Sequence, residues 1–108
     1  MNDKPLEIDA ETVKAAIENN DNVVILDVRS DEEVARGTLP NSIHIELADI
    51  EAKIAKAVPD KDKTIYAYCL TGGRSGQATQ LLRNMGYTNA YSISQGILAW
   101  RAKHYPTV

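Results

Sequence analysis

Hydrophobic residues follow two alternating patterns along this chain of 108 residues, one typical of buried strands and the other of amphipathic helices. Short apolar, β-branched or aromatic runs predict strands. These runs fall at residues 6–8, 23–26, 42–45, 64–68 and 90–93. Between them, apolar residues return every three or four positions, which predicts helices. The predicted helices cover residues 10–19, 47–58, 75–85 and 96–104.

Capping residues support these boundaries. Asp9 precedes the first predicted helix and is a favoured N-cap residue. Pro59 predicts the end of the helix over 47–58, and Gly86 suits the C-terminal cap of the helix over 75–85. Ser30 and Glu33 have the spacing of a capping box, so we interpret Glu33 as a helix cap rather than an acid catalyst.

The order of the elements predicts the fold class. Strands that alternate with helices are typical of an α/β protein with a parallel sheet and helices on both faces. We therefore expect about four to five strands in one domain that spans residues 1–108, with no internal repeat or linker. In such sheets ligands bind beyond the carboxyl ends of the strands.

Composition and charge narrow the function classes. The chain has 12 basic and 15 acidic residues without a basic run, so nucleic acid is not an expected partner. No apolar stretch has the length of a membrane span, and membrane association is not expected. One cysteine and two widely separated histidines lack paired metal-ligand spacing, which predicts neither a metal site nor a cofactor. The lone thiol fits a cytoplasmic location.

Cys69 is the candidate for chemistry. It ends the predicted strand over 64–68 and is followed by Gly72, Gly73 and Arg74 before a predicted helix. Backbone amides in such a turn point their donors toward one spot, in front of a helix N-terminus, and favour an anion there. A sulfur held in the turn should ionise more easily than a free thiol. An inert core cysteine is the alternative, but burial does not explain the glycines and the arginine.

Two ordered blocks and the tail resemble the rhodanese family of sulfurtransferases. The first block is residues 25–30, Ile-Leu-Asp-Val-Arg-Ser, with Glu33, Gly37 and residues 39–43 after it. The second is residues 69–75, Cys-Leu-Thr-Gly-Gly-Arg-Ser, which looks like the active-site loop of the family. The tail, residues 96–100 with 105–106, is similar to the closing helix. Thr38 and Gln95 depart from the pattern, where His and Gly are common.

This resemblance implies a reaction and its residues. The Cys69 thiolate would attack the sulfane sulfur of a donor such as thiosulfate or another persulfide, and the resulting persulfide would pass its outer sulfur to an acceptor thiol, cyanide or a partner protein. No general base is required. The binding loop would be formed by Leu70, Thr71, Gly72, Gly73, Arg74 and Ser75. Arg74, its only formal charge, would either stabilise the anion or shape the loop.

Other conspicuous residues receive structural interpretations. Asp27 and Arg29 follow a predicted strand and are expected to support loops at the sheet edge near Cys69. His44 alternates with two isoleucines, which favours a surface or loop-contact position. Trp100 is expected in the core or in a groove wall.

Two other functions remain open. A cysteine phosphatase or an arsenate reductase needs a longer loop between cysteine and arginine than the four residues, 70–73, found here. A non-catalytic sulfur carrier or protein-interaction module would keep the same loop without turning over a small donor. Activity toward thiosulfate and cyanide would separate a catalyst from such a module.

Overall fold

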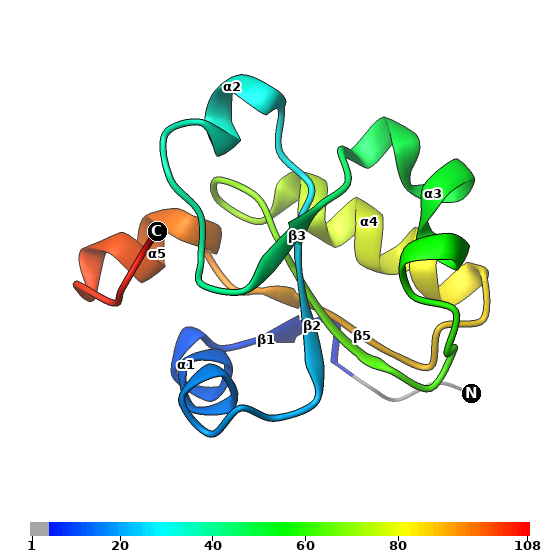
Figure 1. Ribbon diagram of the computed structural model, residues 1–108, viewed down its shortest axis with the longest axis horizontal. Coiled ribbons are helices and arrows are strands. Elements are labelled where there is room, and N and C mark those ends of the chain that lie inside the picture. The colour runs from blue at the N-terminus through cyan, green and yellow to red at the C-terminus, as the bar shows by residue number, and fades with distance from the viewer. Residues whose placement is uncertain (1–4) are drawn as a thin grey trace.

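The computed structural model describes residues 5–108, in which five strands form one parallel sheet in the order β1-β5-β4-β2-β3 (Figure 1). The strands are β1 Glu7–Ile8, β2 Val23–Asp27, β3 Ser42–His44, β4 Thr64–Tyr68 and β5 Asn89–Ile93. All four neighbouring pairs are parallel, as the continuous apolar runs predicted. The predicted fold class is therefore confirmed.

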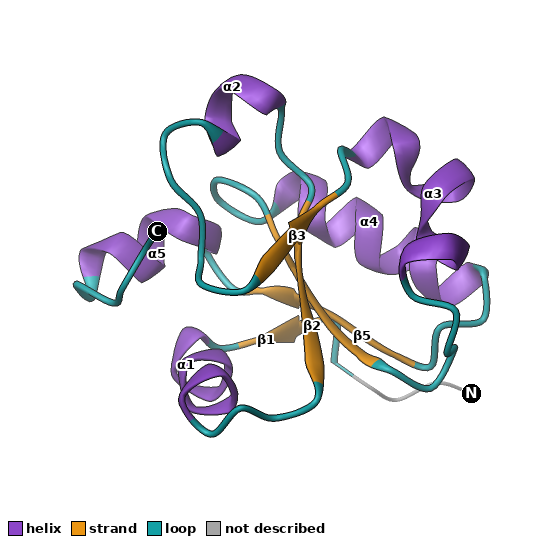
Figure 2. Ribbon diagram, viewed as in Figure 1, coloured by secondary structure: helices purple, strands orange, loops and turns teal. Residues whose placement is uncertain are grey.

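Helices cover both faces of this sheet (Figure 2). They are α1 Ala10–Glu18, α2 Asp31–Val34, α3 Ile50–Ala57, α4 Gly73–Asn84 and α5 Gly96–Ala102. One hydrophobic cluster joins α3 and α4 to the sheet through residues such as Leu26 and Ile65, and it includes Cys69. The other joins α1 and α5 to the opposite face, where Ile25 packs with Trp100. Leu26 and Ile25 lie on opposite faces because side chains alternate along a strand.

The predicted caps are present. The Asp9 carboxylate accepts a hydrogen bond from the Thr12 amide at 2.8 Å, and Ser30 and Glu33 form a complete capping box at the start of α2. Gly86 has a φ of +98°, which lets the chain leave α4. Trp100 is fully buried, as expected.

Two helix starts differ from the prediction, and α5 ends at Ala102, two residues before the predicted end. The segment that begins at Leu47 starts as a 3-10 helix, Leu47–Asp49, before α3, and its first amide is bonded to the carbonyl of Val28. Helix α4 begins at Gly73, two residues earlier than predicted, because Gly72 adopts a φ of +123° and turns the chain directly into the helix.

The strand order has its switch point between β2 and β4. From β2 the chain continues to β3 on one side, whereas from β4 it continues to β5 on the other. Loops that leave neighbouring strands in opposite directions open a crevice, and this is the usual ligand site of α/β sheets. The loop after β2 contains Arg29 and leads to α2, and the loop after β4 begins at Cys69.

Candidate functional site

Cys69 directly follows the central strand β4, at its carboxyl end. Its exposed fraction is only 1%. The following loop reverses at Gly72, whose positive φ favours glycine. The N-terminal turn of α4 then returns toward the sulfur, because the amide of Ser75 lies 3.4 Å from Cys69 Sγ. A strand end, a short loop and a helix start thus surround one thiol.

Backbone amides donate hydrogen bonds to the Cys69 sulfur, and one side-chain hydroxyl lies close to it. The Gly72 amide lies 3.1 Å from Sγ, and the Ser75 hydroxyl lies 3.5 Å from it. Burial raises the pKa of the Cys69 thiol, but the Ser75 hydroxyl and amide, followed by the Gly72 and Thr71 amides, lower it more. The net pKa lies below the ordinary value, so the loop favours the thiolate over the thiol.

The Ser75 hydroxyl is held in place by a residue that the sequence patterns did not single out. Ser92, near the end of β5, is buried and its hydroxyl lies 2.7 Å from the Ser75 hydroxyl. Ser75 Oγ also lies 3.3 Å from the carbonyl oxygen of Gly72, to which it can donate. The only signal in the sequence is a small polar residue within an otherwise apolar strand. That signal says nothing about its partner.

Helix α5 is hydrogen-bonded to the start of the Cys69 loop. The Ile97 amide donates to the Cys69 carbonyl at 3.0 Å, and the Leu98 amide donates to the Leu70 carbonyl at 3.2 Å. Gly96 permits this approach, because a Cβ at this position would lie 2.5 Å from both carbonyl oxygens. Gln95, which departs from the family pattern, takes the left-handed φ of +60° that favours glycine.

The Arg74 guanidinium pairs with a carboxylate on α2. Its Nη1 donates to Glu33 Oε1 at 2.6 Å and its Nη2 donates to Oε2 at 2.8 Å, a bidentate pair. Glu33, and more weakly Cys69, hold the pKa of the Arg74 guanidinium above its ordinary range. Glu33 is therefore both the predicted helix cap and an ion partner of the Cys69 loop.

Asp27 and Arg29 form a second bidentate pair, which is almost completely buried. Arg29 also donates to the carbonyl of Gly37 at 2.7 Å, and the Tyr68 hydroxyl donates to Asp27 Oδ2 at 2.7 Å. Burial raises the pKa of Tyr68 to about 12, so its hydroxyl remains a donor. Since Tyr68 directly precedes Cys69, this network supports the base of the loop.

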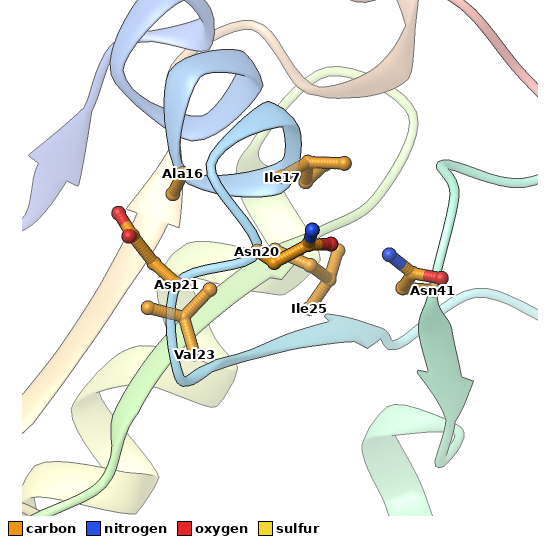
Figure 3. Close-up of a pocket in the computed structure, with 7 residues that line it drawn as sticks. All are labelled: Ala16, Ile17, Asn20, Asp21, Val23, Ile25 and Asn41. Carbon is orange, nitrogen blue, oxygen red and sulfur yellow. The ribbon is translucent and has the colours of Figure 1, made fainter.

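Three other residues considered in the sequence have different surroundings. Leu70 is 38% exposed at the mouth of the loop, whereas Thr71 contributes its amide. His44 is exposed and its Nε2 lies 2.6 Å from the carbonyl oxygen of Arg29, a loop contact as expected. A separate hollow of about 130 Å³ lies at the opposite end of the sheet, between the end of α1 and the start of β2, near Asn41 (Figure 3).

A comparison with protein-family models decides the family. The model described as "Rhodanese-like domain" matches residues 9–103, most of the chain. The chain belongs to the rhodanese-like family.

Relatives of this rhodanese agree with the assignment. A "Sulfurtransferase" of Allochromatium vinosum is 30% identical over 102 residues, which cover 94% of each chain. The "Thiosulfate sulfurtransferase PspE" of Escherichia coli is 42% identical over 64 residues, which cover 59% of this chain and 62% of that one. A crystal structure of a rhodanese-related protein of Thermoplasma volcanium superposes with a TM-score of 0.81 at 31% identity, over 96% of this chain and 98% of that one.

The described part of this rhodanese, residues 5–108, offers no other centre of comparable chemistry. It contains no group of three or more His, Cys, Asp or Glu side chains placed to hold a metal ion. It also contains no helix with the length and apolar character needed to cross a membrane. The thiol of Cys69, with donors directed at it, is what the arrangement can use for nucleophilic chemistry.

Proposed function

We propose that this rhodanese is a sulfurtransferase that forms a persulfide on Cys69. One observation supports the proposal most: the buried Cys69 sulfur accepts hydrogen bonds from the Gly72 amide and the Ser75 amide, and the Ser75 hydroxyl lies 3.5 Å from it. These donors stabilise a negative charge on the sulfur before and after transfer. The names of the relatives, sulfurtransferase and thiosulfate sulfurtransferase, point to the same reaction.

The reaction takes two displacement steps. The Cys69 thiolate attacks the sulfane sulfur of a donor, a new S–S bond forms, and the old S–S bond breaks. With thiosulfate as donor, the bonding electron pair leaves with sulfite. An acceptor thiolate or cyanide then attacks the outer sulfur of the persulfide, and Cys69 departs as a thiolate. Neither step needs an external oxidant, reductant or general base.

The residues in and around the loop have different roles in the proposed reaction. The backbone amides of residues 70–75 bind the anionic sulfur, with Gly72 and Gly73 letting the backbone come close. Asp27 and Arg29 support the loop through Tyr68, the residue before Cys69. Arg74 shapes the loop through Glu33. We place the reaction in the cytoplasm, where a single thiol stays reduced.

The mass of the intact protein tests the proposal. After incubation with thiosulfate, the protein should gain the mass of one sulfur atom, and a reductant should remove it. Cys69→Ser should gain nothing, because the chain has no other thiol. A sulfur adduct that persists in Cys69→Ser would rule out Cys69 as the carrier.

Turnover separates this enzyme from the two alternatives. A sulfur carrier or interaction module would form the adduct once and fail to produce thiocyanate repeatedly from thiosulfate and cyanide. A cysteine phosphatase would hydrolyse an aryl phosphate. We expect repeated thiocyanate formation and no phosphate release, because only the four residues 70–73 separate Cys69 from Arg74.

A further inference from the structure

The only positive charge of the Cys69 loop is neutralised by a carboxylate outside the loop. Arg74 is the only charged residue between positions 69 and 75. Both of its terminal nitrogens are bound by the Glu33 carboxylate, at 2.6 and 2.8 Å. A cation neutralised in this way attracts an incoming anion much less than a free one, since the carboxylate repels what the guanidinium attracts.

Glu33 is itself held in place as an anion. Its Oε1 accepts hydrogen bonds from the Ser30 amide and the Ser30 hydroxyl, both at 3.1 Å. The Arg74 guanidinium, helped by these bonds, holds the pKa of Glu33 at about 2. Glu33 therefore keeps its negative charge throughout the pH range in which a thiolate can react.

An apolar surface lies next to the buried thiol. Leu70 and Leu98 are 38% and 47% exposed, and they are two of the four large hydrophobic residues exposed within residues 5–108. A hydrogen bond from the Leu98 amide to the Leu70 carbonyl brings the two backbones together. The amide of the preceding residue, Ile97, donates to the Cys69 carbonyl. Exposed leucines at this position offer contact to an organic group rather than to an inorganic ion.

From these two features we infer that the site selects a sulfane-sulfur donor with a single negative charge and an apolar organic group, and that Glu33 enforces the charge limit. The inference rests on the proposed function. Organic persulfides and thiosulfonates have this chemistry, whereas thiosulfate carries two negative charges and no organic group. Glu33 acts through Arg74 and is a positioning residue.

Two donors of nearly equal size isolate the effect of charge. Thiosulfate and methanethiosulfonate both present a terminal sulfane sulfur, but a methyl group replaces one charged oxygen in the second. Attack by the Cys69 thiolate forms the same persulfide from either one. The S–S bond of the donor breaks and its electron pair leaves with sulfite or with methanesulfinate, so both reactions balance without a further reactant.

The decisive variant is Glu33→Gln. Glutamine keeps the capping-box hydrogen bond but removes the charge. With cyanide as acceptor, the KM for thiosulfate should fall about tenfold and the KM for methanethiosulfonate about threefold, because a dianion gains about twice the electrostatic energy of a monoanion. The preference of kcat/KM for methanethiosulfonate over thiosulfate should therefore shrink about threefold.

Two controls show whether the effect passes through Arg74. Glu32→Gln removes a charge from the exposed neighbouring position on the same helix and should leave both KM values within about twofold of the parent. In an Arg74→Gln background, the further change Glu33→Gln should no longer lower the KM for thiosulfate, because there is no cation to release.

The organic group is tested with benzenethiosulfonate. The parent should prefer it to methanethiosulfonate, and Leu98→Ala should reduce that preference about threefold, since part of the contact surface is lost. Alanine keeps the helix propensity of α5.

The outcomes are distinguishable. An unchanged preference between thiosulfate and methanethiosulfonate in Glu33→Gln, or an equal change in the Arg74→Gln background, would overturn the role of Glu33. An unchanged preference for benzenethiosulfonate in Leu98→Ala would overturn the role of the leucines. If the parent forms no persulfide with any of the three donors, the proposed function fails and the inference fails with it.

Discussion

The two sides of the Cys69 loop are each supported by an arginine–carboxylate ion pair, one buried and the other partly exposed to solvent. On the inner side, Arg29 and Asp27 are 1% and 0% exposed. On the outer side, the Arg74 and Glu33 side chains of the second pair are 38% and 25% exposed. Both pairs are bidentate, so geometry does not distinguish them. The dielectric surroundings do, because attraction between charges is screened where water reaches them.

This difference in exposure gives the two ion pairs different roles: the inner pair supports the fold, and the outer pair affects the choice of donor. The inner pair is tied to Tyr68 and to the carbonyl of Gly37, so each of its groups is held by several partners. A buried charge that loses its partner is costly, which makes this side rigid. The outer pair joins α2 to the loop by two hydrogen bonds, and because it is partly exposed it can change at small cost in stability. We therefore expect substitutions on the inner side to affect folding and those on the outer side to affect donor choice.

The largest effect is expected from Asp27→Asn. This change leaves the Arg29 guanidinium buried without a counter-charge, and it should lower the free energy of unfolding by about 3–5 kcal/mol. Urea denaturation measures the loss. Glu33→Gln is the matched change on the outer side, and it should cost less than about 1 kcal/mol. Similar losses for the two variants would contradict the distinction between the two sides.

The next largest effect is expected from Gly96→Ala in α5. The new Cβ would lie 2.5 Å from the carbonyl oxygens of Cys69 and Leu70, in a backbone conformation with a φ of +54°. Overpacking against backbone should cost about 1–3 kcal/mol and displace the loop, so sulfur transfer should fall as well. Thermal unfolding and steady-state rates check this.

The control for that substitution is Gly76→Ala in α4. There the new Cβ would meet only the Leu6 side chain, at an ordinary 3.9 Å. We expect no loss of stability and a gain of up to about 1 kcal/mol, because alanine favours a helix. A Gly96→Ala protein as stable as Gly76→Ala would show that α5 does not need to approach the loop so closely.

The sequence was sufficient for features that depend on local patterns. The apolar runs at 23–26 and 64–68 gave two central strands, because both faces of these strands are buried. The glycines after Cys69 gave the tight loop, and the Ser30 and Glu33 spacing gave the capping box. Each of these features is determined by residues within one or two turns of chain.

Contacts between distant segments could not be derived in this way. Glu33 and Arg74 are 41 positions apart and meet only because β2 and β4 are neighbours in the sheet. The capping box also gave Glu33 a complete local explanation, so nothing in the pattern suggested a second partner. Ser92 was missed for a related reason, since its hydroxyl gains a purpose only where β5 passes Ser75.

A smaller effect is expected on the acidity of the thiol. In Ser75→Ala the Cys69 sulfur loses the hydroxyl that contributes most to the lowered thiol pKa, so the pKa should rise. The rate of alkylation by iodoacetamide, followed against pH, should show its inflection below the usual thiol value for the parent and at a higher pH for the variant. An unchanged inflection would mean that the backbone amides alone stabilise the thiolate.

The smallest effect concerns the outer pair in acid. Folding lowers the pKa of Glu33 from 4.5 to about 2, with Arg74 as the main cause. A lowered carboxyl pKa stabilises the folded state above the unfolded pKa, and this contribution is lost as the pH falls through the folded pKa. The difference in free energy of unfolding between the parent and Glu33→Gln should therefore be constant above about pH 5 and shrink toward pH 2. Because the pair is partly exposed, this difference should stay below about 1 kcal/mol at neutral pH.

Urea denaturation of both proteins from neutral to acid pH measures this difference, with Glu32→Gln as the control. A difference that grows as the pH falls would have the wrong sign for an ion pair and would remove Glu33 as the partner of Arg74.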